Sequence, residues 1–157
     1  MARRYGRARG GARCVGHAPV NTPPSTTVCS SVRLDGSTAW ASWRGGTTKE
    51  RFLSFVAGVL APSLREGDLV VMDNLSAHRA DGVAEAVEAR GASVAYLPPY
   101  SPDLNPIEKM WSKVKASLRA AGARTAEGLA AATAAAMASV TATDCRGWFE
   151  SCGYAQE

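Results

Sequence analysis

Apolar and polar positions alternate in two short segments near the start of the chain. Residues 28–34 (VCSSVRL) alternate loosely, and residues 38–43 (TAWASW) combine aromatic and small residues, so both predict strands. Asp35-Gly36 lies between them and is a strong turn signal. The two segments together therefore predict a β-hairpin.

The hydrophobic pattern then changes to helical spacing and alternates with apolar runs. Thr47 and Glu50 form a candidate capping box, and apolar residues follow at helical spacing to about residue 60. The continuous run 68–72 (DLVVM) predicts a strand covered on both faces. A helix over 81–90 follows, which we expect Asp81 to help cap, and 93–97 (SVAYL) predicts the next strand.

Three helices are predicted in the last third of the chain. The first begins at Pro106 and runs to about residue 121, and the second covers about 126–140. The third covers about 144–152, with Thr143 as its expected cap. This order of elements predicts an α/β fold with a mixed sheet flanked by helices. In such sheets, sites form at the carboxyl ends of the parallel strands.

Composition and charge narrow the class of protein. The 157 residues are 46% hydrophobic and 20% charged, with a formal net charge of +4, so we expect one globular domain that is compatible with a polyanionic partner. The four scattered cysteines predict free thiols. No apolar run is long enough to span a bilayer, and no apolar segment follows the Arg-rich start. We therefore expect a cytoplasmic protein without a membrane partner.

The stretch LPPYSPDLNPIE (residues 97–108) holds four of the eight prolines and ends on Glu108. Asn105 and Pro106 suit the cap and first position of a helix, so Glu108 could serve only as part of the cap. A cap alone needs no proline-rich approach, however. The prolines restrict the backbone and would fix where Glu108 points.

Asp73 directly follows the apolar run 68–72, at the expected end of its strand. One interpretation is that Asp73-Asn74 simply begins a loop. The other is that Asp73 and Glu108, each placed just past one of two consecutive strands, face one crevice. Carboxylates are ligands that suit Mg²⁺. A pair of such ions can activate the attacking oxygen and stabilise the leaving oxygen in phosphoryl transfer. Two carboxylates are too few to hold two ions, so a third carboxylate is needed.

The motifs VVMDNLSAH (70–78) and LPPYSPDLNPIEKMWSKVK (97–115) resemble the DDE endonuclease domain of mariner-like insertion-sequence transposases. The resemblance implies a ribonuclease H-like fold, two Mg²⁺ or Mn²⁺ ions and cut-and-paste transposition. It makes Asp73 the second catalytic Asp and Glu108 the terminal Glu, both of them metal ligands. Asn74, His78 and Asn105 match motif positions with supporting roles, and His78 could orient a phosphate or a water molecule.

The chain departs from this family at its start. The family's first catalytic Asp lies on a central strand, shortly before the segment that MARRYGRARGGAR resembles, and a helix-turn-helix domain precedes it. We therefore expect residues 1–157 to form a partial catalytic domain in which two interior sheet edges lack partners. Asp35, Asp81 and Asp103 are poor replacements for the missing Asp. The chain is expected to be inactive alone. The alternative is a non-catalytic remnant that binds DNA or full-length transposase.

Basic residues follow Glu108, and an Arg-rich group stands at the start of the chain. Contacts of such residues with phosphates would make affinity for DNA dependent on salt; the alternative is a solvated helix face. Trp111 is interpreted as core because it shares a face with Ile107 and Val114. The expected partners are the double-stranded DNA of transposon ends and a second copy or full-length transposase. The candidate DNA-binding residues are Lys109, Lys113, Lys115 and Arg119.

Overall fold

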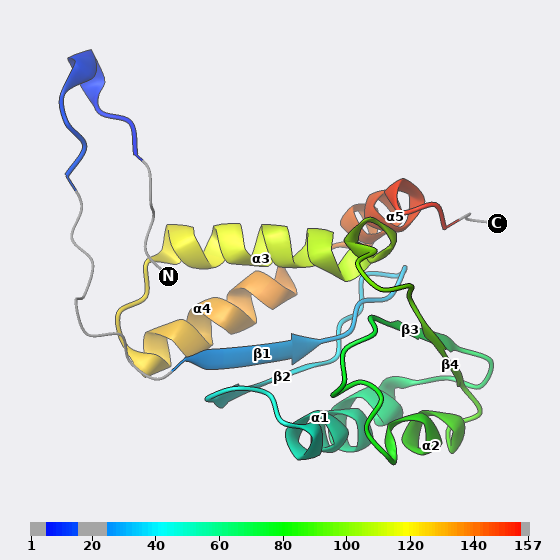
Figure 1. The fold of residues 1–157 in the computed structure, drawn as a ribbon. Coiled ribbons are helices and arrows are strands. Elements are labelled where there is room, and N and C mark those ends of the chain that lie inside the picture. Colours follow the sequence, from blue (N-terminus) through cyan, green and yellow to red (C-terminus); the bar gives the residue numbers. More distant parts are fainter. Residues whose placement is uncertain (1–5, 16–24, 155–157) are drawn as a thin grey trace.

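The computed structural model describes residues 6–15 and 25–154, and Figure 1 shows their arrangement. The α/β class is confirmed: two small sheets are flanked by helices, with α1 and α2 on one side and α3 and α4 on the other. A short 3₁₀ turn, η1 (Arg9–Gly11), belongs to the first described segment. Arg3 and Arg4 of the Arg-rich start lie outside the described residues.

The predicted hairpin is present. Strand β1 (Thr26–Ser30) pairs antiparallel with β2 (Trp40–Arg44), and both strands are shorter than the sequence pattern indicates. The Asp35-Gly36 turn closes it: the backbone N–H and the hydroxyl of Ser37 both donate to Asp35 Oδ1. Gly36 has φ +90°, and a Cβ there would lie 2.6 Å from the backbone N of Ala142. Glycine is therefore required at this turn.

A continuous helical segment follows the hairpin. It consists of α1 (Lys49–Phe55), one π-helical turn η2 (Val56–Leu60) and a 3₁₀ turn η3 (Ala61–Ser63). The cap is Thr48, whose hydroxyl accepts a hydrogen bond from the N–H of Arg51. The prediction of Thr47 as cap was wrong by one residue, because neighbouring threonines offer the same hydroxyl and only the backbone path selects one.

The second sheet is a parallel pair. Strand β3 (Leu69–Met72) pairs with β4 (Ser93–Tyr96), and α2 (Val83–Glu88) lies between them in the sequence. The prediction that Asp81 caps α2 was wrong: Gly82 occupies the cap position at φ +87°, without a side-chain bond. The prediction that β3 is covered on both faces was also wrong, since Leu69 is 60% exposed and only Met72 is buried.

Three helices complete the fold. Helix α3 (Pro106–Ala121) has the bounds predicted from the sequence, and it ends at Gly122, which adopts the left-handed conformation. It is followed by α4 (Ala126–Ala138) and α5 (Ala142–Ser151). The cap of α5 is Thr141, which forms a reciprocal capping box with Asp144, and not Thr143 as predicted.

Two hydrophobic cores lie on opposite faces of the hairpin. The first joins α1, η2, β3 and α2, and the second joins α3, α4 and α5. Side chains of the hairpin reach both, because successive residues of a strand point to opposite faces. Cys29 and Trp43 pack against the first core, while Val32 and Trp40 pack against the second.

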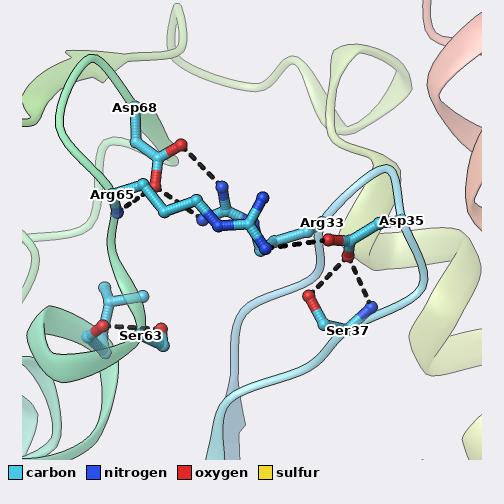
Figure 2. Close-up of polar contacts among 7 residues, drawn as sticks. Arg33, Asp35, Ser37, Ser63, Arg65 and Asp68 are labelled. Atoms are coloured by element: carbon cyan, nitrogen blue, oxygen red, sulfur yellow. Dashed lines mark hydrogen bonds and ion pairs between the residues drawn. The ribbon is translucent and has the colours of Figure 1, made fainter.

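The antiparallel pair β1–β2 and the parallel pair β3–β4 form two separate sheets that share no strand pairing. An ion pair joins them. Arg33, just after β1, donates two hydrogen bonds of 2.6 Å to Asp68, just before β3 (Figure 2). The backbone N–H of Arg65 also donates to Asp68, and the Arg65 side chain reaches Asp35 at 3.4 Å. This pair fixes one end of the space between the sheets.

Of the helices in residues 6–15 and 25–154, none combines the length and the apolar character needed to cross a bilayer. All four cysteines are free thiols, as predicted. Burial raises the pKa of the Cys29 thiol to about 11.

The Arg33–Asp68 pair predicts a specific loss of stability in acid. The Arg33 guanidinium holds the pKa of Asp68 down to about 2. A lowered pKa in the folded state stabilises the protein above the ordinary Asp pKa, near 4, and this contribution is lost as the pH falls from about 4 to 2. We expect Asp68→Asn to lower the free energy of unfolding at pH 7 by roughly 1–2 kcal/mol.

Urea unfolding of both proteins at pH 7, 4 and 3 measures this effect, and the difference should narrow as the pH falls. Arg65→Ala is the matched control. Its exposed ion pair with Asp35 should be worth no more than about 0.5 kcal/mol. A constant difference across this pH range would refute the assignment.

Candidate functional site

Asp73 and Glu108 line the same cavity, of about 260 Å³, between β1, β3 and α3. Asp73 is the first residue after β3, and Glu108 is the third residue of α3, which follows β4. Because β3 and β4 are parallel, their carboxyl ends lie at the same edge of the sheet. The topology therefore brings two carboxylates from separate elements to one cavity.

Local contacts hold Asp73. The backbone N–H of Leu75 lies 3.4 Å from Asp73 Oδ1, and His78 Nδ1 lies 2.5 Å from the same oxygen. The His78 ring packs on the ring of Phe52, with centroids 4.3 Å apart, and only 20% of the His78 side chain is exposed. His78 thus joins Asp73 to the first core. It is a positioning partner of the carboxylate in this structure.

The loop after Asp73 is tied to β4. Arg79 donates to the side-chain oxygen of Asn74, and its guanidinium lies 4.5 Å from the ring centroid of Tyr96. The Tyr96 hydroxyl donates to the backbone oxygen of His78. Asn74 is exposed and is not among the residues that line the cavity. Its contact with Arg79 helps to shape the loop.

The proline-rich stretch runs from β4 to α3 through a 3₁₀ turn, η4 (Pro102–Leu104). Its start continues the sheet, because the N–H of Leu97 donates to the backbone oxygen of Met72 at 2.8 Å. Its end is held by the Tyr154 hydroxyl, which donates to the backbone oxygen of Leu104. The connection is therefore anchored at both ends before Glu108.

The start of α3 has no side-chain cap. Asn105 occupies the cap position of α3, but its side chain makes no capping hydrogen bond; it lines the cavity instead. Glu108 is exposed, and no residue in the described part of the chain donates a hydrogen bond to its carboxylate. Neither side chain is used to complete the helix start, so both are available to a ligand.

The basic residues of α3 fall into two groups. Lys115 and Arg119 are exposed and Lys109 is half-buried. Lys113 instead donates to the backbone oxygen of Ser139 at 2.8 Å and to the carboxylate of Asp144, which ties α3 to α5. Trp111 packs against the second core, as interpreted from the sequence.

Of the acidic side chains that the structure describes, only Asp73 and Glu108 line this cavity. Within the described ranges, no group of three or more His, Cys, Asp or Glu side chains is arranged to hold a metal ion. Asp35 lies in the hairpin turn, in the polar cluster of Figure 2. Sequence reasoning missed the contact between His78 and Asp73 and the pairing of Arg33 with Asp68. The short spacing of Asp73 and His78 could have indicated their contact. No sequence pattern indicates that Arg33 meets Asp68, because the two residues belong to distant segments.

The sequence also matches a known protein family. The profile of the DDE superfamily endonuclease family matches residues 1–130, which include Asp73 and Glu108. The chain therefore belongs to the DDE superfamily endonuclease family. Endonucleases of this superfamily catalyse transposase-type cleavage of nucleic acid. They generally use divalent metal ions. No curated protein matches the chain.

The polar side chains that line the cavity supply some of the ligands that a hard divalent cation needs. Asp73 and Glu108 offer carboxylate oxygens, the ligands that Mg²⁺ and Mn²⁺ prefer, and Asn105 adds an amide to the same cavity. Mg²⁺ keeps several waters in protein sites, so two carboxylates suffice to hold one ion. A pair of ions needs more ligands than these described residues provide.

The contacts of Lys113 predict a role in stability. Lys113→Met should lower the midpoint of thermal unfolding by roughly 2–4 °C, because it removes the ammonium group that donates to both Asp144 and the Ser139 carbonyl. Lys115→Met, two residues further along the same helix and exposed, should change the midpoint little. Differential scanning calorimetry of the two variants checks this, and equal midpoints would contradict the assignment.

Proposed function

We propose that this chain carries the metal-binding part of a DNA transposase of the mariner-like, insertion-sequence type, which cuts and transfers DNA strands. The observation that supports this most is the convergence of Asp73 and Glu108, from the ends of neighbouring parallel strands, on one cavity. Membership of the DDE superfamily endonuclease family supports the same conclusion.

Asp73 and Glu108 act as the metal ligands. A bound divalent ion supplies Lewis acidity at a phosphate and at the oxygen that attacks it. His78 orients the Asp73 carboxylate through Nδ1, and Asn105 presents its amide to the same cavity. Lys109, Lys115 and Arg119 contact the phosphates of double-stranded DNA. Lys113 is of less use for this purpose while it holds Asp144.

Cleavage requires a third carboxylate for the second ion, and we place it on a segment other than the described residues. The chain in isolation should therefore bind a metal ion and DNA but not cut. The absence of a three-carboxylate group among the described side chains also favours the alternative function, a non-catalytic protein that binds DNA or full-length transposase. The two functions differ in whether the cavity binds metal.

Metal binding is tested by titrating the purified chain with Mn²⁺ in a calorimeter. Glu108→Gln and Asp73→Asn should each weaken binding at least about tenfold, because each removes a charged ligand. Asp103→Asn, in the same proline-rich stretch, is the matched control and should bind as the parent does. If Glu108→Gln leaves Mn²⁺ affinity unchanged, the proposed site is wrong and the non-catalytic function is preferred.

Cleavage is tested on supercoiled plasmid with Mg²⁺ or Mn²⁺. We expect no nicking above that of Glu108→Gln. Efficient cutting that depends on Glu108 would show that the described carboxylates suffice without a third.

The DNA-binding face is tested by the salt dependence of affinity for a short duplex. Lys115→Met should reduce the slope of log affinity against log salt by about one, since one phosphate contact is lost. Exposed Lys49, on α1, offers a control of equal charge, because Lys49→Met removes a lysine from a different helix. Equal slopes for the two variants would exclude α3 as the DNA-binding face.

A further inference from the structure

Exposed apolar side chains are frequent in the two segments that lead to and from the carboxylates. Six large apolar side chains in the described part of the chain are exposed, and three of them lie in these segments. Leu75 follows Asp73 by two residues, and Tyr100 and Leu104 precede Glu108. Single exposed apolar residues are ordinary on a protein surface, but several beside a candidate site indicate a surface that binds a ligand.

Tyr100 is the most exposed of these side chains, and its ring is fully surrounded by solvent. Tyrosine rings in folded proteins usually bury part of their surface and use the hydroxyl in a hydrogen bond, as Tyr96 and Tyr154 do here. The Tyr100 ring makes no comparable contribution to either hydrophobic core. Packing of the fold therefore gives no reason for an aromatic residue at this position.

The backbone at Tyr100 is also unfavourable for a tyrosine. Its φ is +58°, and no other residue except glycine has a positive φ in residues 6–15 and 25–154. In this left-handed region the Cβ crowds the backbone, and glycine, asparagine and aspartate are the residues that tolerate it. Either glycine or asparagine would suit the loop better. A contact outside the folded chain accounts for the tyrosine, because strained residues of this kind are typical of ligand-binding sites.

The loop keeps Tyr100 close to the carboxylates. The N–H of Leu97 donates to the Met72 carbonyl, so the loop begins beside the end of β3 that Asp73 follows. Three residues of chain reach at most about 11 Å, which limits the distance between the Cα atoms of Leu97 and Tyr100. A DNA strand advances about 3.4 Å per nucleotide. The ring therefore lies within a few nucleotides of a phosphate bound at Asp73.

The chemistry of the loop favours a nucleobase as the partner of Tyr100. Every base offers a flat face that stacks on an aromatic ring, and such stacking is tolerant of sequence. A polyproline ligand for an adaptor domain is a poor alternative. Polyproline II needs φ near −75° at each residue, and the φ of +58° at Tyr100 interrupts it directly after Pro98 and Pro99.

We propose that Tyr100 stacks on an unpaired base of the DNA, next to the phosphate bound at Asp73 and Glu108, and so holds the strand in register with the metal site. This inference rests on the proposed function and makes Tyr100 a positioning residue. Paired bases inside a duplex present no free face to the ring, so the contact requires an opened or single-stranded end. The ring alone carries the contact, and the hydroxyl is dispensable.

The test measures the affinity of the 157-residue chain for DNA by fluorescence anisotropy. One probe is a blunt duplex, and the others are the same duplex with a short single-stranded tail at the 3′ or the 5′ end. Tyr100→Asn should weaken binding to at least one tailed duplex about tenfold, as expected for the loss of one stacked base. It should leave the blunt duplex unaffected. The slope of log affinity against log salt should stay the same, since no phosphate contact is lost.

Further substitutions at the same position separate stacking from general apolar contact. Tyr100→Phe keeps the ring and should bind the tailed duplex as the parent does. Tyr100→Leu keeps apolar bulk without a ring and should bind as weakly as Tyr100→Asn. A 2-aminopurine base in the tail reports the contact directly. At saturating protein, its fluorescence should be lower with the parent or Tyr100→Phe than with Tyr100→Leu, because stacking on a ring quenches it.

The thermal midpoint shows whether the tyrosine serves the fold. It should rise by about 1–3 °C in Tyr100→Asn, because asparagine tolerates a positive φ. A fall in the midpoint would identify Tyr100 as a structural residue and overturn the proposal. A change in oligomeric state of Tyr100→Asn without DNA, measured by sedimentation velocity, would also overturn it, since the ring would then belong to a protein interface.

The DNA measurements distinguish this proposal from the proposed function. Equal affinity of the parent and Tyr100→Asn for both tailed duplexes would refute stacking alone. Failure of the parent to bind any of the probes would refute DNA binding as well. Mn²⁺ affinity should be the same in Tyr100→Asn and in the parent, so the metal site is judged separately by Glu108→Gln.

Discussion

The ion pair between Arg33 and Asp68 joins two sheets that share no backbone hydrogen bond. Its two parallel 2.6 Å bonds fix the start of β3 against the end of β1. The placement of Asp73, four residues beyond Leu69, depends on that alignment. The polar cluster of Figure 2 and the carboxylate cavity thus involve opposite ends of β3.

The two carboxylates of the cavity are held by different means. Glu108 is placed by an anchored, proline-rich connection and by the first turn of α3. Asp73 sits at the start of a loop that is held by hydrogen bonds and ring contacts to His78 and Tyr96. Precise placement of both groups matters, because metal ligands act only within a narrow range of distance and angle.

Strands β1 and β3 each pair with one neighbouring strand, so each has one edge without a strand partner in the described part of the chain. Exposed edges normally invite association, and proteins cover them with charge, proline or other elements. Here residues of β1 and β3 line the carboxylate cavity together with apolar side chains such as Phe52 and Trp111, which belong to the first and second core.

The sequence by itself determined the helices, the hairpin turn and the candidate carboxylates, because these depend on spacing, turn chemistry and motif. Asp35-Gly36 and the proline-rich approach to Glu108 are local signals of this kind. It misplaced the caps at Thr47 and Thr143 by one or two residues, since adjacent hydroxyls are equivalent until the backbone is fixed. Only the tertiary structure decided that Arg33 meets Asp68, that Lys113 is bound to Asp144 and that β1 faces β3. These contacts join residues far apart in the chain, and their energies depend on distances that no local pattern encodes.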